Sequence, residues 1–131
     1  MNQTKVQNSG NGYTVATVGN INGFTGKLFL REALGLTSME VSFGTLGVGE
    51  AVPFFHKHKQ NEEVYIVLSG KGIFTLDGRE YEVGEGSVVS VAPDVDRCTK
   101  NVGDSPMTYL CIQAKASSLE QAVADDAIIK Q

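Results

Sequence analysis

The sequence lacks the features that mark several large classes of protein. No apolar run approaches the roughly 20 residues that a membrane-spanning helix needs. Basic residues do not dominate either: 11 Lys and Arg stand against 15 Asp and Glu, for a net charge of -4. A chain without a cluster of basic residues offers no electrostatic footprint for nucleic acid. We therefore expect a soluble protein that binds neither membranes nor nucleic acids.

Cysteine is also scarce, with two residues in a chain of 131. Two are too few for a disulfide framework of the kind that stabilises small secreted domains. The amino terminus lacks the basic-then-apolar order of a secretory signal. We expect a cytoplasmic protein with Cys98 and Cys111 reduced, although a hairpin formed by the segments around them would permit a cross-strand disulfide.

What the sequence has in abundance is glycine, at 15 residues. The glycines separate short apolar segments, and from residue 38 onward the expected strands recur about every 8 to 12 residues, a spacing typical of an all-β sandwich or barrel. The length suits a single domain. The expected strands cover residues 38–46, 51–58, 63–68, 72–77, 79–83, 87–92, 97–101 and 107–113.

Two short helices are expected outside this series of strands. Residues 27–35 place leucines among charged residues and end at Gly35, a common helix stop. Near the carboxyl terminus, Ser117 precedes Glu120 by three residues, which is the capping-box pattern. We therefore divide the chain into a flexible amino-terminal tail (1–12), a β-barrel domain (13–116) and a carboxyl-terminal helix or tail (117–131).

The segment "HKHKQNEE" holds the only two histidines of the chain, His56 and His58. Alternate residues of a strand point to the same face, so a strand here would present both imidazoles to one side. Glu63 opens the next expected strand, which can fold back and bring its carboxylate to the same point. Two imidazoles and a carboxylate suit Zn, Fe, Mn or Ni and leave coordination positions open for substrate.

The same segment also fits a solvated strand with no metal. Lys57 and Lys59 alternate with the histidines, and two glutamates follow. Ion pairs between such exposed residues contribute little to stability. Strand alternation alone leaves both interpretations open.

A wider pattern resembles the cupin superfamily. "HKHKQNEEVYIVLSG" is similar to the first cupin motif, and "GEGSVVSVAPDVDRCTKN" is similar to the second. The resemblance implies a double-stranded β-helix, also called a jelly roll or cupin barrel. Cupins include metal-dependent dioxygenases, isomerases and decarboxylases as well as sensors and storage proteins, so the fold alone does not define the function. The matching residues are His56, His58, Glu63, Gly70, Gly86 and Asn101, with Gly49 one residue from its usual spacing.

The second motif departs from the family pattern at three positions. Ala92 stands where proline is usual, Asp94 where glycine is usual, and Arg97 where the third metal-binding histidine is usual. A guanidinium stays protonated and has no acceptor, so it cannot bind a metal. The family's set of three histidines and one glutamate is therefore incomplete here.

Three arrangements of the site remain open. Arg97 can turn inward and pair with Glu63, which would give a metal-free cup for a carboxylate or phosphate. Alternatively, His56, His58 and Glu63 hold the metal as a triad while Arg97 orients an anionic substrate. In the third, a one-residue bulge points Cys98 inward as a fourth ligand and favours zinc.

Other side chains share the parity of the proposed ligands. Tyr65 lies two residues after Glu63, and its hydroxyl can contact a ligand; Gln113 is a further candidate for substrate binding. Phe54 has the same parity, but we expect it to pack in the core. A serine nucleophile is excluded because both histidines belong to the proposed metal set, which leaves no base.

These patterns support three hypotheses for the function. The first is a cytoplasmic cupin that binds one divalent metal and recognises or acts on a small polar, anionic molecule. The second is a metal-free sensor or binding module in which Arg97 supplies the positive charge. The third is a structural domain whose interior is filled by side chains. The resemblance also implies a homodimer formed through edge strands or terminal segments.

Overall fold

A computed structural model describes residues 3–130 of the chain, and β-strands make up most of its regular structure. The all-β fold class is thereby confirmed. The strands are β1 (Lys5–Ser9), β2 (Thr14–Thr17), β3 (Gly26–Phe29), β4 (Glu40–Leu46), β5 (Asn61–Ser69), β6 (Lys71–Leu76), β7 (Arg79–Gly84), β8 (Val88–Val91), β9 (Arg97–Asn101) and β10 (Met107–Lys115). One four-residue helix, α1 (Arg31–Leu34), and one 3-10 turn, η1 (Ala124–Asp126), complete the elements of this part of the chain.

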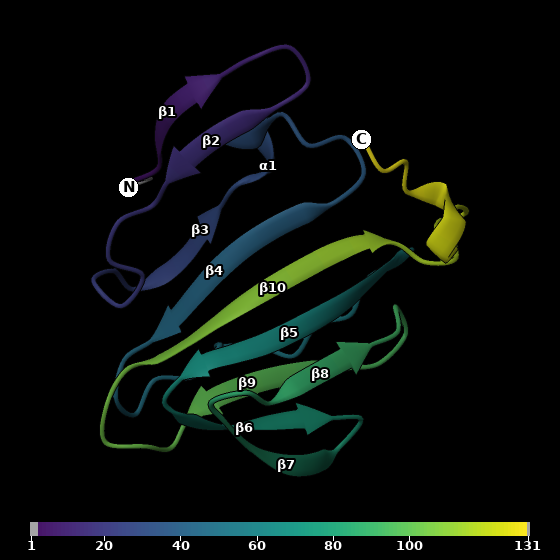
Figure 1. Cartoon of the computed structure of the whole chain (residues 1–131). Coiled ribbons are helices and arrows are strands. Elements are labelled where there is room, and N and C mark those ends of the chain that lie inside the picture. Colours follow the sequence, from purple (N-terminus) through teal and green to yellow (C-terminus); the bar gives the residue numbers. More distant parts are fainter. Residues whose placement is uncertain (1–2, 131) are drawn as a thin grey trace.

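The strands form three antiparallel sheets (Figure 1). The largest has five strands in the order β3-β4-β10-β5-β8, and a three-stranded sheet has the order β7-β6-β9. The strands β1 and β2 form a separate hairpin near the amino terminus. Within residues 3–130, no helix is long and apolar enough to span a membrane.

The core lies between the five-stranded and three-stranded sheets. Along β5, Glu63, Tyr65 and Val67 are buried and alternate with more exposed residues, as one buried face of a strand requires. The Tyr65 ring lies 5.0 Å from the ring of Phe74 on β6 and 5.8 Å from that of Tyr109 on β10, measured between ring centroids. Aromatic packing therefore joins the two sheets next to Glu63.

The chain passes from one sheet to the other at Gly70, between β5 and β6. This residue has φ 85°, in the left-handed region, and a Cβ added to it would lie 2.6 Å from the Pro106 carbonyl oxygen. Only glycine fits both the backbone conformation and the space. The crossing between the sheets thus explains why the first motif has a glycine at position 70.

The helix expected over residues 27–35 is only half present. Residues Arg31–Leu34 are helical and end at Gly35, which has the left-handed conformation usual after a helix. The preceding residues Gly26–Phe29 form the edge strand β3 instead, paired with β4. Lys27 therefore belongs to the sheet.

The helix expected at the carboxyl terminus does not form. Ser117 has φ 63°, which is incompatible with its use as a helix cap, and only the turn η1 follows. Leu119 and Ile128 are 81% and 96% exposed, so the apolar side of the expected helix has no surface to pack against. Short helices without packing are marginal in water. Figure 1 shows this segment passing beyond the end of β10 and then turning back.

Two further expectations about pairing are wrong. The amino-terminal segment expected as a tail contains β1, which pairs with β2. The segments 97–101 and 107–113 do not form a hairpin: β9 pairs with β6, whereas β10 pairs with β4 and β5. Cys98 and Cys111 consequently lie in different sheets, and both are free thiols.

Candidate metal centre and ligand cavity

Both histidines lie on an irregular segment that runs beside β9. The expected strand over residues 51–58 is absent, and the segment makes only isolated bridges, including one between His56 and Arg97. Pro53 has no N–H to donate, which prevents a regular ladder there. The backbone N–H groups of His56 and His58 donate to the carbonyls of Arg97 and Pro93, at 3.1 and 3.0 Å. The backbone thus holds both imidazoles against β9 and the loop before it.

Glu63 reaches the same point from the opposite sheet. It lies on β5, which pairs with β10 and β8 and not with the histidine segment, so the expected folding back of one strand onto the other is wrong. Even so, one potential ligand atom from each of His56, His58 and Glu63 lies within 4.8 Å of the others. The two imidazole rings are 5.3 Å apart and nearly perpendicular, at 89°. The three side chains converge as the sequence predicted. Glu63 comes from the five-stranded sheet, and the histidines come from the irregular segment beside β9 of the facing sheet.

Each histidine has a buried ring nitrogen without a hydrogen bond among the described residues. These atoms are Nδ1 of His56 and Nε2 of His58. The latter is 3.4 Å from Glu63 Oε2 but makes no hydrogen bond with it. Buried polar atoms are normally paired, and a site for an ion is one of the recognised reasons for an exception. Burial also lowers the pKa of His56 and favours the neutral imidazole, which is the form that binds metals.

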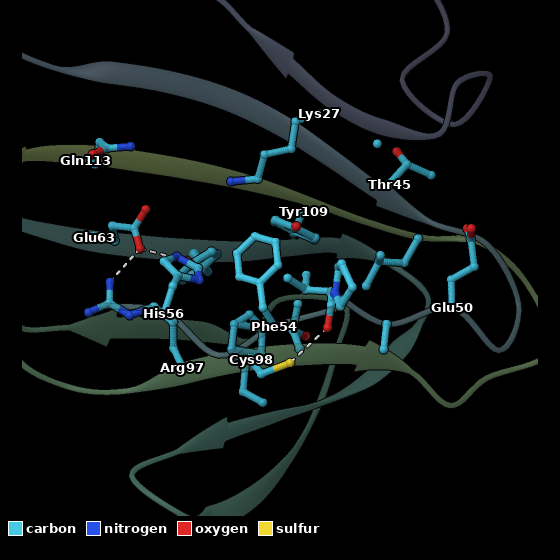
Figure 2. A pocket seen from close by; sticks show the side chains of 18 of the residues that line it. Lys27, Thr45, Glu50, Phe54, His56, Glu63, Arg97, Cys98, Tyr109 and Gln113 are labelled. Atoms are coloured by element: carbon cyan, nitrogen blue, oxygen red, sulfur yellow. Dashed lines mark hydrogen bonds and ion pairs between the residues drawn. The ribbon is translucent and has the colours of Figure 1, made fainter. Parts of the chain in front are cut away.

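Arg97 points into the barrel and pairs with Glu63. Its Nη1 lies 2.6 Å from Glu63 Oε1, and both side chains are 2% exposed (Figure 2). Its Nε and Nη2 groups donate to the carbonyls of Ala92, Pro93 and Val95. The guanidinium is therefore largely occupied by the protein itself, with its charge compensated by Glu63. This leaves little of it to bind an anionic substrate.

The Glu63 carboxylate is held by three donors. Oε1 accepts from Arg97 and from the Tyr65 hydroxyl at 2.7 Å, while Oε2 accepts from the Cys111 thiol at 3.4 Å. Burial by itself would raise the pKa of Glu63, but these hydrogen bonds outweigh burial and lower it. Burial raises the pKa of Cys111 to about 12, so the thiol keeps the proton that it donates. Glu63 is thus ionised, and Oε2 is the oxygen that faces His58.

The residues of this centre fit a divalent metal with three protein ligands. Two neutral imidazoles and one ionised carboxylate form a set that Zn, Fe, Mn and Ni accept. The arginine at the position of the third histidine contributes no ligand. Cys98 contributes none either, because β9 pairs with β6 without a bulge and the thiol donates to the Val52 carbonyl at 3.2 Å. Cys98 lies outside the cluster of potential ligands.

A cavity of about 530 Å³ opens above this centre. Tyr65 and Gln113 line it, as expected from their parity, although the Tyr65 hydroxyl is already bonded to Glu63. Phe54 lines it too, but at 59% exposure it lies at the surface and not in the core. The sequence reasoning missed several residues of the wall, among them Lys27, Phe29, Leu46, Val52 and Tyr109.

Comparisons with known proteins place this architecture in a family. The family model for the cupin domain matches residues 42–113, which is more than half of the chain. A cupin protein from Bacteroides fragilis has 41% identity, with 92% of this chain and 98% of that chain covered and a TM-score of 0.84. A sugar phosphate isomerase of the cupin superfamily from Silicibacter pomeroyi has 25% identity and a TM-score of 0.62, with 69% of this chain and 59% of that chain covered.

A curated relative matches over a shorter stretch. It is an uncharacterized protein of Methanocaldococcus jannaschii, 38% identical over 56 residues, which are 43% of this chain and 45% of the relative. The match thus covers less than half of that protein. The family match and the likeness to the Bacteroides fragilis protein together show that this chain belongs to the cupin family, with the double-stranded β-helix that its motifs implied.

Proposed function

We propose that this protein is a cytoplasmic cupin that binds one divalent metal through His56, His58 and Glu63 and recognises or acts on a small anionic molecule. The observation that carries the proposal is the pair of buried imidazole nitrogens that make no hydrogen bond within the described residues and lie beside an ionised carboxylate. Three protein ligands leave coordination positions for a ligand oxygen, which a bound metal would polarise as a Lewis acid. The adjoining cavity has the size of a small-molecule site.

The protein's own residues have separate tasks in this proposal. The backbone bonds of the histidine segment orient the imidazoles, and the donors to Glu63 keep its carboxylate ionised and fixed in position. Arg97 acts as a positioning residue for Glu63. A relative named as a sugar phosphate isomerase is consistent with a small anionic ligand.

A second candidate is a metal-free binding module. It is favoured by the buried ion pair between Arg97 and Glu63, in which the guanidinium stands where the family's third histidine would be. In this candidate, chelators change neither stability nor ligand binding. The third candidate, a structural domain with a filled interior, disagrees with the cavity.

Elemental analysis of the purified, untagged protein tests the metal site. We expect close to one divalent metal per chain in the wild type and almost none in His56→Ala, because a triad that loses one ligand binds weakly. Lys57→Ala, an exposed position between the two histidines, is the matched control and should keep the metal.

A wild-type protein that stays empty after incubation with Zn²⁺, Fe²⁺, Mn²⁺ and Ni²⁺ would contradict the metal site. If Arg97→His then gains a metal, the arginine has replaced the ion, and the metal-free candidate is correct.

A further inference from the structure

One charged side chain of the cavity wall, Lys27 on β3, is used by neither the metal centre nor the core. It lies beside Phe29 on the cavity face of β3, with Nζ 5.8 Å from the Phe29 ring centroid. Among the ion pairs within the described part of the chain, Arg31, Arg97 and Lys100 each have a carboxylate partner. Lys27 has no carboxylate within 4.0 Å among these residues. Within residues 3–130, Lys27 is thus a cation of the cavity wall without an ion-pair partner, and Glu50 is a carboxylate lining the same cavity.

The sheet register explains why Lys27 faces the cavity. Lys27 pairs with Gly44 on β4, and Gly44 pairs with Tyr109 on β10, so the three positions form one row across the sheet. A Cβ on Gly44 would lie 2.4 Å from the Tyr109 ring, so the ring covers the space that a side chain at Gly44 would fill. Lys27 and Tyr109 therefore lie on the same wall, and Gly44 between them in the row has no side chain. Figure 2 shows Lys27 directed along this wall toward the side where Glu63 and Gln113 lie.

A second donor lies on the same wall as Lys27. Gln113, on the same wall, accepts a hydrogen bond from Asn61 Nδ2 at 3.0 Å through its carbonyl oxygen. The amide NH₂ of Gln113 is thereby left without a partner within residues 3–130. An ammonium and an amide NH₂ together are donors for a carboxylate or phosphate.

Most of the remaining wall is apolar and offers few groups that can hydrogen-bond a sugar. The hydroxyls of Thr45, Tyr65 and Thr99 already donate to the Ile21 carbonyl, to Glu63 and to the Ile73 carbonyl. Glu50 and Tyr109 are further polar side chains of the wall. A ligand with several hydroxyls would lose its hydrogen bonds to water without replacing them, at a cost for each unpaired group. A ligand with an apolar body would gain from the same wall. The apolar residues concerned are Phe29, Leu46, Val52, Phe54 and Phe74.

We propose that Lys27, assisted by the Gln113 amide, binds the anionic group of the ligand, and that this ligand is a small carboxylate or phosphate ester with an apolar body. The inference rests on the proposed function as a small-molecule site, and it assigns to Lys27 the anion binding that the sequence suggested for Arg97, whose guanidinium is largely occupied by the protein itself. It also distinguishes this cavity from one built for a sugar phosphate.

Amide-resolved NMR titration of the full-length protein tests the proposal, with and without bound metal. The probes are benzoate, phenyl phosphate, inorganic phosphate and glucose 6-phosphate. We expect the two aromatic anions to shift the amides of residues 26–29 and 109–113. Lys27→Gln should weaken their binding about tenfold, the effect of losing one charge-assisted hydrogen bond. Lys71→Gln removes the same charge from an exposed position outside the cavity and should change the affinity less than twofold.

Each other outcome overturns a defined part of the proposal. Equal affinity in Lys27→Gln and wild type excludes Lys27 as the anion site, and tighter binding of glucose 6-phosphate than of phenyl phosphate excludes the apolar ligand. If wild type binds none of the probes, with or without metal, the inference fails as a whole. Metal content is measured separately by elemental analysis. If the wild type binds no metal but still binds the probes in a way that depends on Lys27, only the metal part of the proposed function is rejected.

Discussion

At the scale of single residues, Glu63 is the centre of the site. Its two oxygens receive donors from three strands, namely Tyr65 on β5, Arg97 on β9 and Cys111 on β10. The hydrogen bonds compensate the cost of burying the charge, which otherwise favours the protonated acid. The carboxylate therefore stays ionised with little exposed surface, and its Oε2 faces His58 while Oε1 pairs with Arg97.

The pKa shifts at this site predict that the metal-free protein loses stability in acid. The folded-state pKa values of His56 and Glu63 are lowered from 6.5 and 4.5. The unfolded chain therefore binds protons that the folded chain does not, first below pH 6.5 and again below pH 4.5. We expect the thermal unfolding midpoint of the chelator-treated protein to fall across both ranges. Scanning calorimetry between pH 7.5 and 4 measures it.

The variant His56→Gln isolates the first of these steps. It removes the titrating imidazole and keeps a polar side chain, so its midpoint should change less than that of wild type between pH 6.5 and 5. Identical pH profiles for the two proteins would mean that His56 does not contribute.

The sequence predicted some residues of the site and missed others for physical reasons. The convergence of His56, His58 and Glu63 followed from their spacing, although the elements that carry them differ from those expected. The direction of Arg97 remained open because a one-residue slip of register exchanges the faces of a strand. Lys27 was missed because "KLFLREALG" lacks strand alternation. A helix was expected there, and that expectation gave no reason to place Lys27 on the cavity wall.

At the scale of elements, glycines allow the chain to cross between sheets and to turn. Gly70 and Gly86 have nearly the same positive φ, 85° and 84°. Their surroundings differ, because a Cβ on Gly70 meets the backbone of residues 106–107 at 2.6 to 2.7 Å, whereas a Cβ on Gly86 meets no atom within 4 Å. Alanine variants of these two glycines therefore separate the cost of the positive φ, which both share, from the cost of packing, which only Gly70 has.

We expect Gly86→Ala to lower the free energy of unfolding by about 1–2 kcal/mol, the cost of placing an L-residue in the left-handed region. Gly70→Ala should lose roughly 1–3 kcal/mol more, because the added methyl group overpacks the crossing. Urea denaturation of both variants measures the difference. Equal losses would show that the backbone of residues 106–107 moves away easily.

The strands were easier to predict than the ends of the chain. The apolar alternation of β5 and the glycines between strands are local signals, and tertiary packing agrees with them. The pattern around Ser117 and Glu120 is also a local helix signal, but no surface of the barrel receives the apolar residues that follow. The partners of β9 and β10 could not be inferred from proximity in sequence, because each strand pairs across a large separation in sequence.

At the scale of the whole molecule, we propose that two copies associate through the β3 edge. This strand ends the five-stranded sheet, and Phe29 on it is 51% exposed. Unpaired sheet edges with apolar residues tend to associate. Sedimentation equilibrium should give twice the chain mass of 14.0 kDa. Phe29→Asp should shift the equilibrium to monomer, whereas Val88→Asp on the opposite edge strand β8 should not. A wild type that is monomeric at high concentration contradicts the proposal.

The bonds from Arg97 to the loop before it have a consequence for any substitution at this position. The Val95 carbonyl accepts from both Nε and Nη2, and the carbonyls of Ala92 and Pro93 accept from Nη2. A histidine at this position would add an imidazole but remove those donors, and each hydrogen bond lost from a charged donor costs about 1.5–3 kcal/mol. A variant with histidine at position 97 would therefore gain a fourth ligand at little cost only if the loop changed as well. The arginine and the loop before it depend on each other.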